Sequence, residues 1–383
     1  MLHIALVGVG QELEKLWRMV NHECCKVDKI FSVPTMDLED IVSRAGIDIP
    51  IDDYVEIPDV VGEKYFDYIL VSDVIKSAGC KGRIVEEVER SGFPPNKIID
   101  LTFCQTVEFD SLYNVLKNYL SPNAPDYSFF VTGVSHAYAG TDISSYTLPG
   151  VNLALTSQDL FLDYELAKIF LNAKQKKLRY AIIGVAPFSL HYDLSKSVNR
   201  QRMLAYYPIL KKIHNYDLSE KLLSQLLASS YFQLYDGFLS ELKYNNRLLC
   251  NSMDKDICLD DYVDIRRRLV EWEEKSYPET VEENKQILRK YVENCLNHGV
   301  LPLLVVFPVT PWYNKYFSSI KFSELKNYLC DLSSEYDIPF YDFSSDSRFE
   351  VEDFFDVEHL NVKGAAKISK IVNGLLCYLE ENI

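Results

Sequence analysis

The chain has 383 residues, more than one domain usually contains, so we expect two domains. Its formal net charge of −16 argues against nucleic acid or an anionic membrane surface as the main partner. The 9 cysteines are an odd number spread over a long chain, which fits a reducing compartment better than a disulfide framework. No pair has CxxC spacing, so a zinc site is improbable.

The N-terminal part alternates strands and helices. Four buried strands are predicted there, at residues 2–7, 27–32, 66–72 and 98–101. A helical pattern begins near Glu12, and a second one covers about 82–91. This alternation predicts a small Rossmann-like domain over residues 1–105.

The start of the given sequence leads us to expect no secretory signal. The predicted strand at residues 2–7 begins directly after Met1, and no basic segment or small-residue cleavage site precedes it in the sequence. No apolar stretch approaches the roughly 20 residues that span a bilayer. We therefore expect a cytoplasmic protein without a transmembrane segment.

The turn Gly8-x-Gly10 raises the question of a nucleotide site. The third glycine of the dinucleotide fingerprint is missing, because position 13 is Leu, and Glu12 and Glu14 bring negative charge to the helix start. We favour a structural or docking domain with a degenerate nucleotide site and no bound cofactor, although a functional dinucleotide site remains the alternative.

A serine at the end of a strand stands out in the second part of the chain. Residues 106–126 form a helical linker that ends in prolines, and the apolar run 129–133 follows it. The run ends in Gly133, and Ser135 comes two residues later, where parallel sheets of α/β enzymes place reactive groups. A serine nucleophile needs a base.

That base is available near the C-terminus. Asp356 precedes His359 by three residues, just before a predicted closing helix. A carboxylate in this position can orient the imidazole and leave its other nitrogen free to take a proton from Ser135. A helix-capping role for the Asp-x-x-His segment is the simpler alternative. A metal site formed by His136, His191 and His359 is a third interpretation, but their spacing matches no known zinc pattern.

The segments Gly133-x-Ser135-His136 and Asp356-x-x-His359 together resemble the SGNH (GDSL-like) hydrolases and acyltransferases. The Gly-x-Ser-His segment is closer to the branch of this family that includes the D-alanyl transfer protein of teichoic acid synthesis and polysaccharide-modifying proteins of surface-glycan loci. The resemblance implies a flavodoxin-like three-layer α/β domain over residues 127–383, with a helical insertion at about 196–299. It also implies a catalytic triad of Ser135, His359 and Asp356.

The resemblance further suggests where the oxyanion would be held. The end of the second strand, at Ser157, would donate a backbone N–H, but Ser157 or Thr156 could instead simply cap the next helix. The family's Gly-x-Asn is missing after the third strand, so Ser189, His191 or Tyr192 could substitute for it. The remaining candidates for oxyanion or substrate binding are Gly133, His136, Trp312 and Tyr313.

Two further segments bear on the substrate. The aromatic loop at Trp312 and Tyr313 follows a buried strand and suits a sugar or acyl group, with a packed aromatic cluster as the alternative. Arg266, Arg267 and Arg268 are adjacent in the insertion. They form either a solvated helix face or a basic patch for an anionic donor or acceptor.

The sequence therefore favours an enzyme that transfers or hydrolyses an acyl group on a carbohydrate, such as a precursor of a surface polysaccharide. Its partners would be a small acyl donor and a sugar or glycan acceptor, with no metal and no cofactor. A homo-oligomer or a partner in glycan synthesis is possible. The alternative is an inactive SGNH-like binding or scaffold protein, which the missing Gly-x-Asn keeps open.

Overall fold

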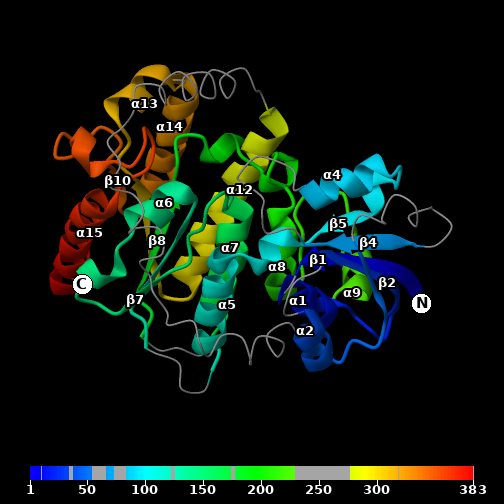
Figure 1. Ribbon diagram of the computed structural model, residues 1–383. Helices are drawn as coiled ribbons and strands as arrows, with labels where there is room; N and C mark the ends of the chain where they lie inside the picture. The colour runs from blue at the N-terminus through cyan, green and yellow to red at the C-terminus, as the bar shows by residue number, and fades with distance from the viewer. Residues whose placement is uncertain are drawn as a thin grey trace. The chain divides into compact units, whose positions relative to one another are not determined.

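The computed structural model divides into two compact units. It describes residues 1–9, 11–33, 38–53, 66–72, 83–121, 126–173, 177–228, 277–317 and 319–382. Unit 1 comprises Met1–Lys117 and Leu194–Lys243, and unit 2 comprises Asn118–Asp193 and Tyr244–Ile383. Both units are α/β structures with parallel sheets, as the sequence predicted in these coarse terms (Figure 1).

The predicted insertion at 196–299 is divided between the two units. Its described part up to residue 228 belongs to unit 1, and residues 277–299 belong to unit 2. Arg266, Arg267 and Arg268 lie outside the described residues, as does Gly10 of the predicted glycine turn. The basic patch in the insertion therefore stays a prediction.

Unit 1 is built on a five-stranded parallel sheet in the order β3-β2-β1-β4-β5. Its strands are β1 (Leu2–Val9), β2 (Cys25–Val33), β3 (Ile51–Asp53), β4 (Tyr68–Val71) and β5 (Ile98–Asp100). Its helices include α1 (Gln11–Met19), α2 (Leu38–Ala45), α4 (Arg83–Arg90), most of α5 (Val107–Tyr119), α8 (Arg202–Leu210) and α9 (Glu220–Leu226). The central strand β1 is buried over Ile4–Val7, as expected for a continuous apolar run in a covered parallel sheet. The short strand β3 was not predicted, because Ile-Asp-Asp lacks an apolar run.

The segment after Leu194 is an integral part of unit 1. Leu227 pairs with Val20 in an antiparallel bridge, and the Asn21 N–H donates to the Leu226 carbonyl at 2.9 Å. The buried Tyr113 hydroxyl of α5 donates to the Ala205 carbonyl of α8 at 2.5 Å. Unit 1 is therefore discontinuous in sequence.

Unit 2 contains a second parallel sheet, in the order β10-β9-β8-β6-β7. Its strands are β6 (Phe129–Gly133), β7 (Gly150–Asn152), β8 (Tyr180–Val185), β9 (Leu301–Val306) and β10 (Phe340–Asp342). Its helices include α6 (Ser135–Gly140), α7 (Leu160–Asn172), α12 (Pro278–Asn297), α13 (Pro311–Tyr316), α14 (Ser319–Tyr336) and α15 (Val362–Asn382).

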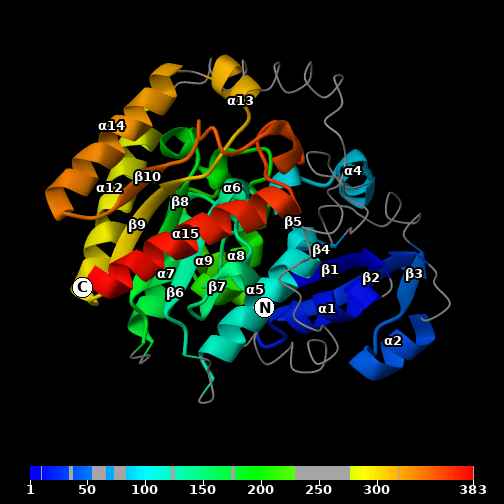
Figure 2. The same cartoon turned by 90° about the vertical axis from the view of Figure 1, so that its left-hand side faces the viewer.

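Helices cover both faces of this second sheet. Val131 of β6 packs in one core with Ile368 of α15, and Figure 2 shows α15 lying across the sheet. The next residue, Thr132, faces the other side, where its hydroxyl lies 2.9 Å from that of Tyr291 on α12. This alternation is the period of a strand, and it gives unit 2 three layers.

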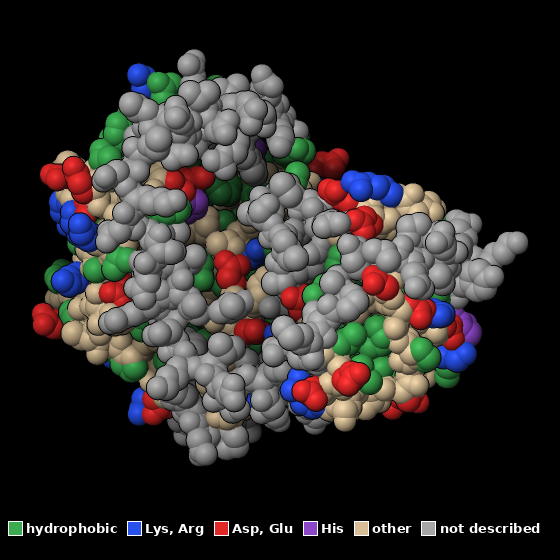
Figure 3. Space-filling view, viewed as in Figure 1, with side chains coloured by type: hydrophobic (Ala, Val, Ile, Leu, Met, Phe, Trp, Pro, Cys, Tyr) green, Lys and Arg blue, Asp and Glu red, His purple; other side chains and the backbone are tan. Residues whose placement is uncertain are grey.

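Acidic and basic side chains are interspersed on the face drawn in Figure 3. Many of the basic side chains pair with acidic ones, for example Arg289 with Glu335 and Arg44 with Glu14. None of the described helices combines the length and the apolar character needed to cross a membrane.

Candidate active site

Ser135 begins α6 directly after β6, in a turn that requires glycine. Gly133 has φ of 141°, and a Cβ added to it would lie 2.5 Å from the Gly184 carbonyl oxygen. The same Cβ would lie 2.7 Å from that of Ala137, so small residues let α6 approach both strands closely. Ser135 is thereby held, half-buried, at the carboxyl edge of the sheet.

Asp356 and His359 lie on a short hairpin before α15. Phe354 and Leu360 form its antiparallel bridge, and the Phe355 N–H donates to the His359 carbonyl at 2.8 Å. The Asp356 carboxylate accepts the backbone N–H of Glu358 at 2.9 Å and of His359 at 2.8 Å. One carboxylate therefore shapes the turn and faces the imidazole.

The structure brings the three predicted residues together. His359 Nε2 lies 2.8 Å from Ser135 Oγ. On the other side of the ring, His359 Nδ1 lies 2.8 Å from Asp356 Oδ2 and 3.0 Å from Oδ1. Burial tends to raise the pKa of Asp356, but the His359 imidazole and the hydrogen bonds from His359 and Glu358 outweigh it and leave that pKa below its usual value. Asp356 is thus a carboxylate at neutral pH, able to orient the ring and to stabilise a positive charge on it.

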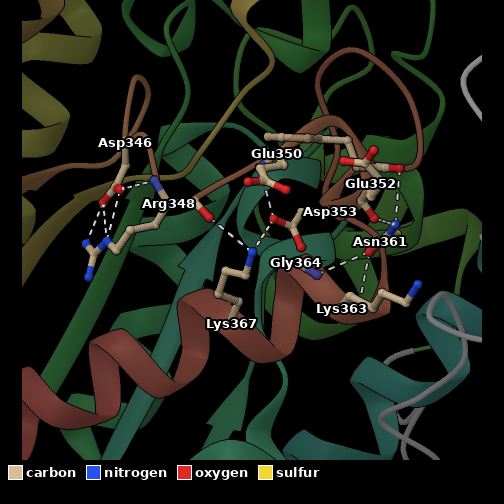
Figure 4. Close-up of polar contacts among 10 residues, drawn as sticks. Asp346, Arg348, Glu350, Glu352, Asp353, Asn361, Lys363, Gly364 and Lys367 are labelled. Atoms are coloured by element: carbon tan, nitrogen blue, oxygen red, sulfur yellow. Dashed lines mark hydrogen bonds and ion pairs between the residues drawn. The ribbon is translucent and has the colours of Figure 1, made fainter.

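A polar network fixes the hairpin to α15 (Figure 4). Asn361 caps the helix, since its Oδ1 accepts the Gly364 N–H at 3.1 Å, while its Nδ2 donates to the Glu352 carbonyl at 2.8 Å. The Asp353 carboxylate pairs with Lys367 one turn further along α15. Asn361 was not among the predicted site residues, although an Asn before an apolar helical pattern is a recognised N-cap signal.

Thr310 ties the end of β9 to the same hairpin. Its hydroxyl donates to the Val357 carbonyl at 2.7 Å, and its backbone N–H reaches the same oxygen at 3.2 Å. Thr310 is fully buried and also caps α13. Its contact with residue 357 spans 47 positions, so no local pattern in the sequence signals it.

His136 lies behind the catalytic histidine candidate. It is 2% exposed, and its ring centroid is 5.3 Å from that of His359. Neither of its ring nitrogens has a hydrogen-bond partner in the described part of the chain. Burial lowers the pKa of His136 to about 3, and the neighbouring His359 adds to this shift. His136 is therefore a neutral, buried imidazole rather than a solvent-facing one.

The end of β7 does not follow the capping alternative proposed for Ser157 and Thr156. Asp159 caps α7 instead, because its side chain accepts the Leu162 N–H at 3.0 Å. Ser157 has a left-handed backbone with φ of 58°, and its carbonyl accepts the Tyr192 hydroxyl at 3.1 Å. The adjacent Gln158 is buried and donates to the Gly133 carbonyl at 3.4 Å, which links this loop to the turn before Ser135.

The loop after β8 is held by a residue that the sequence did not reveal. Asn284 of α12 is 1% exposed, and its amide donates to the carbonyls of Ser189 at 3.1 Å and of Tyr192 at 2.9 Å. The Ser189 hydroxyl accepts the Ala186 N–H at 2.8 Å. His191 Nε2 lies 3.3 Å from Glu324 of α14. Ser189 and Tyr192 are thus parts of an organised loop.

The two aromatic candidates on α13 differ in their surroundings. Trp312 is half-buried, whereas Tyr313 is 1% exposed. The Tyr313 ring stacks on Phe317 with centroids 5.2 Å apart and meets the edge of His136 at 6.0 Å. Tyr313 is therefore packed against the candidate site from the inside, which leaves Trp312 as the more accessible of the pair.

Comparison with known proteins yields one partial match. A protein-family model whose description states no function matches residues 231–378, less than half of the chain. No curated protein matches the chain.

Proposed function

We propose that this chain is a serine-dependent acyltransferase or esterase of the SGNH type. The observation that carries the proposal is the chain of contacts from Ser135 Oγ through His359 to Asp356, with 2.8 Å at each step. A serine, an imidazole and a carboxylate in this order are the parts of a nucleophilic triad. Their arrangement at the carboxyl edge of a parallel sheet agrees with where α/β enzymes place reactive groups.

The chemistry follows from these contacts. His359 Nε2 takes the Ser135 proton as Oγ attacks the acyl carbonyl, and Asp356 stabilises the imidazolium that forms. His359 then gives the proton to the leaving group, which produces an acyl-serine. In the second half, His359 activates either water, giving an esterase, or a sugar hydroxyl, giving a transferase. The backbone N–H groups of Ser135 and of the loop near Ser157 are the proposed oxyanion donors.

The strand orders support the finer fold assignment that we propose. In chain order, the strands of unit 2 run 2-1-3-4-5 across the sheet, the order of flavodoxin-like folds. Those of unit 1 run 3-2-1-4-5, as in the first five strands of a Rossmann fold. We interpret unit 2 as the SGNH-type domain and unit 1 as a Rossmann-like domain. The carbohydrate acceptor, a surface-polysaccharide precursor in the cytoplasm, rests on the sequence resemblance.

A fluorophosphonate probe tests the proposal directly, because only an activated serine reacts with it. We expect the wild type to be labelled at Ser135, and Ser135→Ala and His359→Ala to lose labelling by at least about 100-fold. Ser334→Ala, at an exposed position of α14, is the matched control and should leave labelling unchanged. Labelling that persists in Ser135→Ala would place any nucleophile elsewhere.

A second candidate function is a binding or scaffold protein that has lost turnover. The missing Gly-x-Asn after β8 favours it, and the Ser189 and Tyr192 side chains that could replace the Asn already bond to the backbone. Folded wild-type protein that neither reacts with the probe nor hydrolyses short acyl esters would support this second function.

A further inference from the structure

Unit 1 contains a cavity of about 590 Å³ that has no part in the proposed catalytic site. It lies between β5 and α4 on one side and the segment from Arg200 to Leu222 on the other, and all its described lining residues belong to unit 1. The volume falls within the range of about 300–1,000 Å³ that is usual for small-molecule sites. The cavity is thus large enough for one or two sugar rings.

The lining is rich in groups that both donate and accept hydrogen bonds. Asn96 and Gln201 contribute amides, and Tyr68 and Tyr216 contribute phenols. Burial raises the pKa of Tyr216 to about 12, so this phenol stays protonated and can donate at neutral pH. Sugar hydroxyls are donors and acceptors at once, and amides and phenols match both functions. Tyrosine rings also add apolar surface for the C–H groups of a sugar.

The charges in the lining argue against a phosphorylated ligand. Arg200 is the one cation among the described lining residues, and its guanidinium is 3.1 Å from the Asp217 carboxylate. Asp100 also lines the cavity, and its Oδ1 accepts the Thr102 N–H at 3.0 Å. A phosphate would meet the carboxylates of Glu89, Asp100 and Asp217 against one cation. The ion pair of Asp217 and the hydrogen bond to Asp100 use part of what these two carboxylates could offer to an ammonium group. A neutral, hydroxyl-rich molecule fits this balance best.

We propose that the cavity between β5, α4 and Arg200–Leu222 binds a neutral saccharide. The site would give unit 1 a carbohydrate-recognition function in place of the nucleotide function that its glycine turn first suggested. The inference uses only unit 1, so it does not depend on the triad of unit 2 being active.

Saturation-transfer NMR on the full chain tests this proposal. The probes are the methyl glycosides of glucose, galactose and N-acetylglucosamine, with glucose 1-phosphate and glucosamine as charged comparisons. Using Ser135→Ala protein prevents turnover of any acylated impurity. We expect saturation transfer to at least one neutral glycoside and weaker transfer to glucose 1-phosphate.

Variants locate the binding. Tyr216→Phe keeps the ring and removes one hydroxyl, and Asn96→Ala alters an exposed side chain, so both should fold normally. Each should weaken binding about fivefold, as expected for one lost hydrogen bond. Tyr378→Ala, which removes an exposed aromatic side chain of unit 2, is the control and should change nothing.

Several results would overturn the proposal. These are no transfer to any neutral glycoside, preferential binding of glucose 1-phosphate or glucosamine, or sugar binding that is unchanged in both unit 1 variants. Fluorophosphonate labelling of the wild type is a separate measurement that does not depend on sugar binding in unit 1. A failure of this inference is therefore distinguishable from a failure of the proposed catalytic function.

Discussion

At the scale of single residues, the least expected feature is the neutral imidazole of His136. A buried polar group without a hydrogen bond costs on the order of 1–3 kcal/mol, so its presence beside His359 calls for a reason. Because its pKa of about 3 makes it a weak base, His136 does not compete with His359 for the proton that moves in the proposed reaction. Its buried ring lies next to that of His359, with the centroids 5.3 Å apart.

His136→Phe should reveal the buried imidazole through pH dependence. The pKa of His136 is about 3 when folded and near 6.5 when unfolded, so only the unfolded chain takes up this proton between those values. That uptake makes the wild type lose stability as pH falls below 6.5, by up to about 1.4 kcal/mol per pH unit. The variant lacks this loss. The difference in the free energy of unfolding, variant minus wild type, should therefore increase by about 2 kcal/mol from pH 7 to pH 5.

Urea unfolding at pH 7, 6 and 5 measures this difference. Taking the difference between two proteins cancels other titrating groups, such as Asp163, whose raised pKa works in the opposite direction. Ile320→Phe, at an exposed position, introduces the same side chain without removing a titrating group, so as the control it should show no such trend. A constant difference across the pH range would mean that His136 titrates normally.

Asp356→Asn should separate catalysis from folding. The Asn oxygen can still accept the N–H groups of Glu358 and His359, so the hairpin should keep its shape. Its NH₂ group would donate to His359 Nδ1 and force the proton onto Nε2, which then cannot take one from Ser135. We expect ester hydrolysis to fall by roughly 10²–10⁴-fold with a small change in Tm. Asp331→Asn, on the exposed side of α14, should leave both unchanged, and equal losses in the two variants would contradict the assigned role.

At the scale of elements, the hairpin and α15 together hold the His359 imidazole in position. The first turn of α15 packs closely against Asp353 and Leu360 only because residue 364 is a glycine. A Cβ there would overlap the Asp353 carbonyl oxygen and come within 2.7 Å of Leu360. Any sideways shift of α15 would also disturb the Asn361 cap and the Lys367–Asp353 pair (Figure 4). The position of His359 therefore follows from the packing of the helix after it.

Gly364→Ala and Gly374→Ala form a matched pair within α15. The first should lower the free energy of unfolding by about 1–3 kcal/mol through overpacking and should also reduce ester hydrolysis. The second meets nothing within 4 Å and should raise the free energy of unfolding by about 0.5–1 kcal/mol, since Ala favours a helix over Gly. Chemical denaturation measures both, and a Gly364→Ala variant as stable as Gly374→Ala would show that α15 can shift freely.

The sequence predicts those parts of the elements and the site that depend on interactions between residues close together in the chain. The strand ending at Gly133 and the Asp356-x-x-His359 segment are local patterns, and the structure brings both to one edge of a sheet. The positions of Thr310 and Asn284 in the site were not predicted, because each side chain donates a hydrogen bond to a carbonyl group far away in the chain. A buried Thr or Asn has no local periodicity that would distinguish it from a surface residue.

At the scale of the whole molecule, the discontinuity of unit 1 has a direct test. A fragment of residues 1–117 lacks the chain that pairs with Val20 and accepts the Tyr113 hydroxyl, so it should leave apolar surface exposed and fail to fold cooperatively. The peptide 194–228, added in trans, should restore dispersed amide resonances in heteronuclear NMR spectra. A fragment 1–117 that is fully folded without the peptide would contradict this expectation.

The same discontinuity sets an order of events during synthesis on the ribosome. Met1–Lys117 leaves the exit tunnel first, but the segment that completes its unit is translated only after Asn118–Asp193. At about 5–20 residues per second, this delay is on the order of ten seconds, far longer than most small domains need to fold. We therefore expect the nascent first sheet to spend that interval with an uncovered apolar flank, which is the period in which it is most open to aggregation.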